Sequence, residues 1–412
     1  MPQETYVAGI DVGTTKICTV IGRPHADGRL EIIGTGLTWS AGIRRAVIVD
    51  REDAISAIRQ SVAMGERMAG VPMHSAYVGV TGAHIASVNV SGRSHVSQVG
   101  AVSEDDVQRA IQSARDSVPL PQDREIIHEV VRGFAVDGES GVSRPVGMSG
   151  RRLDVDLHVV TGTASIIENI ERCVEDAGVQ VARRALEPIA TGLAVITDAE
   201  RDLGVILIDV GGGTSDVAVF MDGAIAHTSA IPVGGNHVTR DLSRLLRISF
   251  EQAEQVKCRY ARCRPEAVGE DEMVQVTLAG GQETEPIPLR LVAEIIEPRL
   301  EEIFALVRAN IMRAGVYQTA NAGVVLSGGG SQLPDAPQLA SAVLDDLPVR
   351  VGFPRGITGL VKSVDSPIHA TGVGLALLAA EDGASAAPPA APAAAGLLER
   401  VKGWWEGLFP RA

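Results

Sequence analysis

The chain has 412 residues, enough for two to four domains with large buried cores. Its 51 acidic and 37 basic residues give a net charge of −14. This balance excludes general nucleic-acid binding, which needs Lys and Arg to neutralise phosphates, so we expect no nucleic-acid partner. The first residues lack the basic and apolar segments of a signal peptide, and no apolar run reaches the roughly 20 residues that cross a bilayer. Four cysteines without metal-ligand spacing indicate reduced thiols and a cytoplasmic protein.

The first predicted element is a hairpin in residues 6–22, "YVAGIDVGTTKICTVIG", where two apolar strands flank a glycine turn. A stretch with the same form, "GVILIDVGGGTSDVAVF", begins 198 residues later at residue 204. Strand and helix patterns alternate after each hairpin. This arrangement predicts an α/β protein whose fold is duplicated in two similar lobes.

Helix and strand signals alternate along the rest of the body. Ser103 is a predicted N-cap before an acidic first turn, and Gly178 is a predicted helix end. Pro298 should kink the helix that contains it or divide that helix in two. Helices are predicted over residues 103–118, 165–179, 249–261 and 292–315, and strands over residues 75–92, 124–137, 152–162 and 322–327.

The end of the chain predicts a tethered helix. Residues 381–395, "EDGASAAPPAAPAAA", have the Ala/Pro composition of an extended, flexible linker. Residues 396–412 form an amphipathic helical pattern, too short to cross a bilayer. A lipid surface, a groove on a partner protein or the chain's own core could cover its apolar face. The long tether argues against the chain's own core, and the Trp and Phe side chains with nearby Arg and Lys residues favour lipid. That face contains Leu397, Leu398, Val401, Trp404, Trp405, Leu408 and Phe409.

Three glycine turns follow apolar strands: Asp11–Lys16, Asp209–Asp216 and Ser327–Ser331. Most glycine turns are structural, but a duplicated pair with a third turn is more specific. Backbone N–H groups in such turns can surround phosphate oxygens. Asp11 and Asp209 only accept hydrogen bonds, so beside phosphates they require a cation, and Mg²⁺ held through water meets this need. The expected phosphate ligands are Gly13, Thr14, Thr15, Lys16, Gly211, Gly212, Gly213, Thr214, Gly328, Gly329 and Gly330.

These motifs resemble those of the actin/Hsp70/sugar-kinase superfamily of nucleotide-binding proteins. The first two turns are similar to its phosphate loops, the third to its adenosine motif, and residues 187–196 and 370–378 to its two connecting helices. The resemblance implies ATP and Mg²⁺ as ligands. The catalytic lysine that Hsp70 takes from another subdomain has no counterpart here, so we expect ATP binding with weak or no ATPase activity. The implied site adds Gly235, Glu254 and Lys257 as nucleotide contacts, and Glu187 and Asp209 beside Mg²⁺ and water.

Residues 125–162 and 231–246, together with the tethered helix, resemble the FtsA family of bacterial cell-division proteins. The resemblance implies a protein that polymerises on the cytoplasmic face of the inner membrane and tethers FtsZ there. Arg299 is expected to pair with the FtsZ C-terminal peptide, and subdomain 1C to recruit later division proteins. The implied subdomains are 1A (1–84 and 163–196), 1C (85–162), 2A (197–243 and 316–380) and 2B (244–315), then the linker (381–395) and the membrane-targeting helix (396–412).

Two alternative functions fit part of this pattern. A pilus-assembly actin homologue would share the inserted subdomain but lack the tether and terminal helix. A phosphotransferase of the sugar-kinase branch would need a catalytic Asp facing a sugar pocket and would have no use for the tail.

Overall fold

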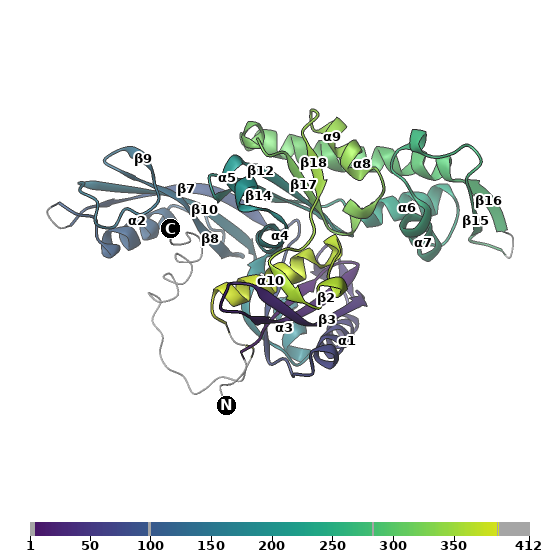
Figure 1. Cartoon of the computed structure of the whole chain (residues 1–412), viewed down its shortest axis with the longest axis horizontal. Helices are drawn as coiled ribbons and strands as arrows, with labels where there is room; N and C mark the ends of the chain where they lie inside the picture. The colour runs from purple at the N-terminus through teal and green to yellow at the C-terminus, as the bar shows by residue number, and fades with distance from the viewer. Residues whose placement is uncertain (1–4, 98–99, 282–283, 385, 387–412) are drawn as a thin grey trace.

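The computed structural model describes residues 5–97, 100–281, 284–384 and 386. Two lobes lie one above the other, and a third, inserted unit projects at one end (Figure 1). The predicted linker lies mostly outside the described residues, and the predicted terminal helix, residues 396–412, lies wholly outside them.

A six-stranded sheet forms the first lobe, in the order β11-β6-β1-β2-β3-β19. Ile10 and Val12 pack with the buried faces of helices α1 and α3, whereas Gly9 faces helix α10 (Ala370–Glu381). A Cβ atom on Gly9 would lie 2.6 Å from the Cβ of Leu375, so glycine is required for this close packing. The strands are β1 (Val7–Val12), β2 (Lys16–Pro24), β3 (Leu30–Trp39), β6 (Ser75–Val80), β11 (Gln180–Leu186) and β19 (Ile357–Gly359), with the small β4 (Ile43–Arg44) and β5 (Val47–Ile48) pair; the helices are α1 (Arg51–Ala69) and α3 (Ala164–Asp176).

The second lobe repeats this plan around a five-stranded sheet, in the order β14-β13-β12-β17-β18. In both lobes the first two strands form an antiparallel hairpin, and a later strand pairs with the first in parallel. The predicted duplication is therefore present in the structure. The strands are β12 (Val205–Val210), β13 (Ser215–Met221), β14 (Ala224–Ile231), β17 (Val324–Ser327) and β18 (Val349–Val351).

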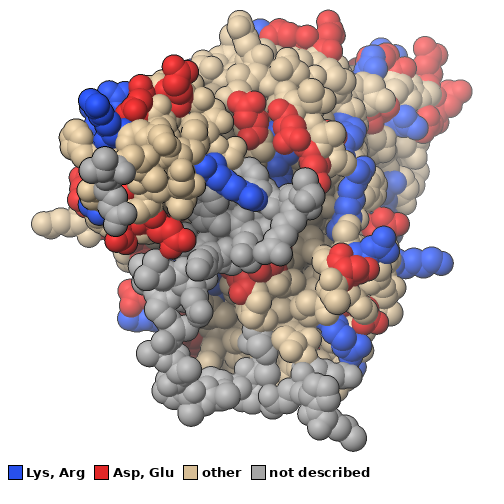
Figure 2. Space-filling view, turned by 60° about the vertical axis from the view of Figure 1, so that its left-hand side comes forward, with Lys and Arg blue, Asp and Glu red and all other residues tan. Residues whose placement is uncertain are grey.

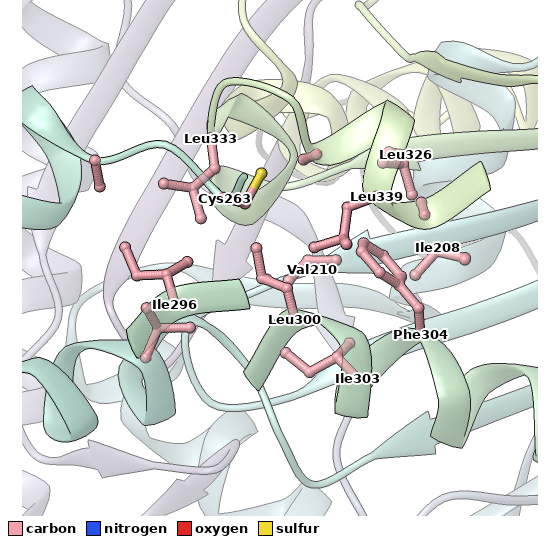
Figure 3. Close-up of a cluster of buried hydrophobic side chains, with 14 of the residues drawn as sticks. Ile208, Val210, Cys263, Ile296, Leu300, Ile303, Phe304, Leu326, Leu333 and Leu339 are labelled. Atoms are coloured by element: carbon pink, nitrogen blue, oxygen red, sulfur yellow. The ribbon is translucent and has the colours of Figure 1, made fainter. Parts of the chain in front are cut away.

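Helices cover the second sheet and extend beyond it to a small hairpin. Figure 3 shows the core between them, where Leu300 and Phe304 of α8 pack near Ile208 and Val210 of β12. Helix α8 is continuous through Pro298, so of the two predicted outcomes, a kink or a division, the division is wrong. The missing N–H removes one backbone hydrogen bond, while buried residues on both sides of the proline stay in one core. The elements are α5 (Asp198–Leu203), α6 (Gly235–Leu245), α7 (Phe250–Tyr260), α8 (Leu289–Arg313), α9 (Ala336–Val343), β15 (Met273–Thr277), β16 (Thr284–Pro288) and the short η1 (Pro265–Ala267), η2 (Tyr317–Thr319) and η3 (Gly329–Gln332).

The inserted unit is a four-stranded sheet, in the order β7-β10-β8-β9, with helix α2 on one face. Ser103 caps α2 as predicted, because its side chain accepts from the Asp106 N–H and its own N–H donates back to that carboxylate. Gly92 allows β7 to lie close to α2, because a Cβ at this position would lie 2.1 Å from the carbonyl oxygen of Ala110. The elements are β7 (Ala86–His95), α2 (Glu104–Asp116), β8 (Arg124–Val136), β9 (Glu139–Val142) and β10 (Arg152–Thr163).

Side chains join the inserted sheet to the second lobe. Ser87 donates to the carbonyl of Thr228 at 2.8 Å, and Asn89 donates to the carbonyl of Ala226 at 3.1 Å. The buried His158 contacts the Asn89 Oδ1 at 2.7 Å and the Thr228 hydroxyl at 3.0 Å. The inserted unit therefore contacts the second lobe, although the chain enters and leaves it from the first.

Two helices connect the lobes: α4 (Glu187–Val195) and α10 (Ala370–Glu381). They lie in one apolar core that contains residues from both large sheets. A Cβ on Gly374 would lie 1.8 Å from the carbonyl oxygen of Ala190, so the two helices pack backbone against backbone. The preceding short helices are η4 (Val361–Ser363) and η5 (Pro367–His369).

Two expected boundaries differ in the structure. Strand β19 pairs with β3 in the first sheet, although residues 316–380 were assigned to the second lobe. Helix α10 includes Glu381, where the linker was predicted to begin, and the Ala386 N–H donates to the carbonyl of Tyr6 at 2.8 Å. Both segments bury apolar surface against the first lobe, which the local composition does not reveal. The other subdomain limits remain predictions.

Charged side chains are mixed on the face that Figure 2 shows. Acidic and basic groups are interspersed there among the described residues rather than gathered into a continuous basic surface. No helix in the part of the chain that the structure describes is long and apolar enough to span a membrane.

Candidate nucleotide cleft

A cleft of about 510 Å³ lies between the two lobes. Its volume is within the range of pockets that bind small molecules. Every residue predicted to contact phosphate, ribose or cation lines this one cleft, although these residues come from distant parts of the sequence. They are Asp11, Gly13, Thr14, Thr15, Lys16, Glu187, Asp209, Gly211, Gly212, Gly213, Thr214, Gly235, Glu254, Lys257, Gly328, Gly329 and Gly330.

The two repeated turns have the same closing hydrogen bond and face each other. The Gly13 N–H donates to the carbonyl of Lys16 at 3.1 Å, and the Gly211 N–H donates to the carbonyl of Thr214 at 3.0 Å. A Cβ on Gly212 would lie 1.8 Å from the Oγ1 of Thr15. Glycine at this position therefore allows the two turns to approach across the cleft.

The third turn and helix α7 line the same cleft. Gly328 has a φ of 75°, and a Cβ there would lie 2.2 Å from Asp209 Oδ1. On the second-lobe side, the Lys257 ammonium donates to Glu254 at 2.6 Å, to the Thr239 hydroxyl at 2.8 Å and to the Gly235 carbonyl at 3.3 Å. These bonds fix the orientation of the predicted ribose contacts.

Four carboxyl groups gather where the turns meet, three of them buried and the fourth, Asp209, partly buried. Burial raises the pKa of Asp11 to about 6, opposed by Lys16 and reinforced by Asp209. Burial raises the pKa of Asp216 to about 7, with the Thr81 hydrogen bond opposing the shift. The pKa values of the remaining two, Glu187 and Asp209, are also raised, in both cases chiefly by burial.

When ionised, the four carboxyl groups of this cluster carry more negative charge than the neighbouring Lys16 ammonium can balance. The Lys16 ammonium lies 3.8 Å from Asp11 Oδ2 and also donates to the carbonyl of Ile368. Glu187 Oε1 is buried and has no hydrogen-bond partner in the described structure. A cation carrying bound water would neutralise the carboxylates and supply donors to that oxygen.

The carboxylates beside the glycine turns fit a cation that keeps bound water. Among the described residues, no group of three or more His, Cys, Asp or Glu side chains is arranged as direct metal ligands. Mg²⁺ usually keeps several waters and binds through one or two carboxylates together with phosphates. Asp11, Asp209 and Glu187 would hold such waters, and the cation would neutralise phosphate charge.

Several polar residues of the cleft were absent from the predicted set. The Thr81 hydroxyl donates to Asp216 at 2.5 Å, and the Thr15 hydroxyl donates to Asn236 at 3.3 Å. Asp216 ends the second glycine turn, and its place in that turn is the sequence signal that could have predicted it in the cleft. Thr81 and Asn236 lie outside the quoted turns and only tertiary structure brings them to the cleft.

Arg299 and the predicted membrane-binding residues lie elsewhere. Arg299 is on α8, where its guanidinium donates to Asp241 of α6 at 2.7 Å and pairs with Glu302. It does not line the cleft. Leu397, Leu398, Val401, Trp404, Trp405, Leu408 and Phe409 lie outside the described residues.

Duplicated lobes, two connecting helices and an interlobe cleft of facing glycine turns define the actin-like class of proteins. Solved structures share this fold at low sequence identity. The PilM–PilN type IV pilus biogenesis complex matches with a TM-score of 0.65 over 91% of this chain and 98% of that chain, at 14% identity. MreB 5 of Spiroplasma citri, solved bound to AMPPNP, matches with a TM-score of 0.52 over 90% and 95% of the two chains, at 14% identity.

Sequence comparison then specifies the family. The family model for cell division protein FtsA matches residues 206–374, and the model for the SHS2 domain inserted in FtsA matches residues 82–161. The chain is 37% identical to cell division protein FtsA of Pseudomonas aeruginosa over 98% of both chains. It is 33% identical to FtsA of Escherichia coli over 90% of this chain and 89% of that protein. The chain belongs to the FtsA family, and the predicted actin-like fold with an FtsA-type insertion is confirmed.

Proposed function

We propose that this cell division protein binds ATP with Mg²⁺ in the interlobe cleft. The observation that carries the proposal is the pair of matching glycine turns, one from each lobe, that meet at a buried group of carboxylates. Phosphates would accept from the turn N–H groups, while Mg²⁺ would offset the negative charge. Glu254 and Lys257 would orient the ribose. We propose weak or no hydrolysis, because the catalytic lysine of Hsp70 has no counterpart in the sequence.

Isothermal titration calorimetry with ATP and Mg²⁺ tests this proposal. Lys16→Ala should weaken ATP binding about tenfold or more, since it removes a charged donor beside the phosphates. Lys362→Ala is the matched control, because Lys362 is exposed and does not line the cleft. Equal affinities of both variants and the wild type would contradict the proposal.

We further propose that the protein polymerises on the cytoplasmic face of the inner membrane, held there by residues 396–412. The segment has a net charge of about +1, so apolar burial rather than lipid charge should drive its binding. One short helix binds reversibly, whereas many helices on one polymer bind firmly through effective concentration.

Sedimentation with liposomes tests the membrane anchor. The full chain should sediment with vesicles at both low and high salt, whereas a chain ending at Ala395 should stay in solution. The full chain carrying Trp404→Ser and Trp405→Ser should behave like the truncated chain. Equal sedimentation of the full and truncated chains would exclude this anchor.

We propose that the second lobe captures the FtsZ C-terminal peptide through Arg299, which tethers the division ring. A peptide carboxylate would have to compete with Asp241 for the guanidinium. Arg299→Ala should therefore weaken binding of a synthetic FtsZ peptide, and Asp241→Asn should strengthen it. Arg308→Ala is the control on the same helix, because Arg308 is held by Asp345. Recruitment of later division proteins through the inserted subdomain completes the proposed role.

A further inference from the structure

Two buried threonines connect the cleft to the helices that join the lobes. Thr191 is on α4 and is fully buried, and Thr371 is on α10 with 6% of its surface exposed. Thr191 Oγ1 lies 3.1 Å and Thr371 Oγ1 lies 3.3 Å from the same Asp209 oxygen, Oδ2. The two hydroxyl oxygens lie 2.9 Å from each other. One carboxylate oxygen therefore contacts both connecting helices.

When Asp209 is ionised, the three contacts cannot all be hydrogen bonds at once. The two threonine hydroxyls then supply the only two protons for three oxygen–oxygen contacts. Either both hydroxyls donate to Asp209, or one donates to the other, which then donates to Asp209. In the first arrangement Asp209 accepts from two hydroxyls, and in the second it accepts from one. A carboxylate without other donors favours the first arrangement, and one that accepts from a further donor can accommodate the second.

The location of these three residues links their hydrogen bonds to the packing of the helices that connect the lobes. Asp209 lines the cleft, and its other oxygen, Oδ1, lies beside Gly328 of the third turn. Helices α4 and α10 pack backbone against backbone at Ala190 and Gly374, one turn or less from the threonines. Because these helices lie in the core between the two sheets, a change in their packing moves one lobe relative to the other.

We propose that Thr191 and Thr371 are positioning residues that couple Mg²⁺-bound nucleotide at Asp209 to the connecting helices. This inference depends on the proposed nucleotide function of the cleft. Without cation, both hydroxyls donate to Asp209 and hold the two helices to it. Asp209 would hold Mg²⁺ through water, and this additional donor to the carboxylate would leave one hydroxyl free to bond the other, so that the helices would repack. Removing the hydroxyls should leave nucleotide contacts intact but abolish the effect of Mg²⁺ on the helices.

The test compares the wild type with the Thr191→Val and Thr371→Val double variant, with ATP in EDTA and with ATP and Mg²⁺. Calorimetry should give similar affinities for both proteins in EDTA, within about twofold, and about a tenfold smaller gain from Mg²⁺ in the variant. Hydrogen exchange should show Mg²⁺-dependent protection of α4 and α10 in the wild type alone. Protection of residues 13–16 by nucleotide should persist in both.

Controls separate this coupling from general destabilisation. Thr19→Val makes the same substitution at a buried position of the first lobe, where Thr19 Oγ1 lies 2.9 Å from Ser61 Oγ. This variant should keep the Mg²⁺ response. Thr191→Ser and Thr371→Ser should restore the response, because serine keeps the hydroxyl. The single variant Thr371→Val serves if the double variant does not fold. An unchanged Mg²⁺ response in the valine variants overturns the coupling, whereas absence of ATP binding in the wild type overturns the cleft function and the coupling with it.

Discussion

Replacing Gly212 with alanine should weaken nucleotide binding by preventing the two phosphate turns from approaching each other. A Cβ at this position would lie 1.8 Å from Thr15 Oγ1 and 2.9 Å from Thr15 Cβ. Threonine is β-branched, so its hydroxyl can leave only by adopting a less favourable rotamer. That rotation also breaks the 3.3 Å hydrogen bond from Thr15 to Asn236.

These two costs set the size of the effect. A strained side-chain rotamer costs about 0.5–1.5 kcal/mol, and a lost hydrogen bond about 1 kcal/mol. Together they disfavour the closed cleft by about 1.5–2.5 kcal/mol. Since each 1.4 kcal/mol changes an equilibrium constant tenfold, the affinity for ATP should fall about ten- to sixtyfold. Further displacement of the turns would increase the loss.

Calorimetric titration of ATP with Mg²⁺ measures this loss. Gly133→Ala is the control for the general effect of replacing glycine, because a Cβ there meets no atom within 4 Å. Thr15→Ala removes the 1.8 Å contact, so Gly212→Ala should cost less affinity in the Thr15→Ala background than in the wild type. Wild-type affinity in Gly212→Ala, or an equal loss in the two backgrounds, would refute the close approach of the two turns.

Two further predictions concern the charged groups of the cleft. The pKa of Asp216 is raised from 3.8 to about 7, so the native state binds its proton more tightly than the unfolded state. Stability without nucleotide should therefore fall as pH rises from about 4 to about 7, and Asp216→Asn should gain in melting temperature relative to the wild type across this window; parallel melting curves would contradict the assignment. Lys257→Met leaves the Glu254 carboxylate without its 2.6 Å ammonium partner and should lower the free energy of unfolding by about 2 kcal/mol in chemical denaturation. Adding Glu254→Gln should restore most of that loss, and a further loss instead would show that the pair is not the cause.

The sequence predicts the cleft well because its turns carry local signals. Asp11 and Asp209 each precede glycines between two apolar strands, and a tight hairpin is the natural structure for that pattern. Their repetition 198 residues apart predicts two lobes, and facing lobes bring the turns together.

Features that depend on long-range packing were not predictable in this way. Thr191 and Thr371 lie in apolar helices without a polar motif, and only the meeting of α4 and α10 brings both to Asp209. Strand β19 is three residues long, so its pairing with β3 has no clear sequence pattern. Pro298 is a strong local break signal, but the buried residues around it maintain one helix, which shows tertiary packing overriding a local preference.

A crystal structure of the protein grown with ATP and Mg²⁺ tests the central claim most directly. The account predicts triphosphate density between residues 13–16 and residues 211–214, with the metal reaching Asp11 and Asp209 through water. An empty cleft at saturating ATP, or a nucleotide bound elsewhere on the protein, would contradict it.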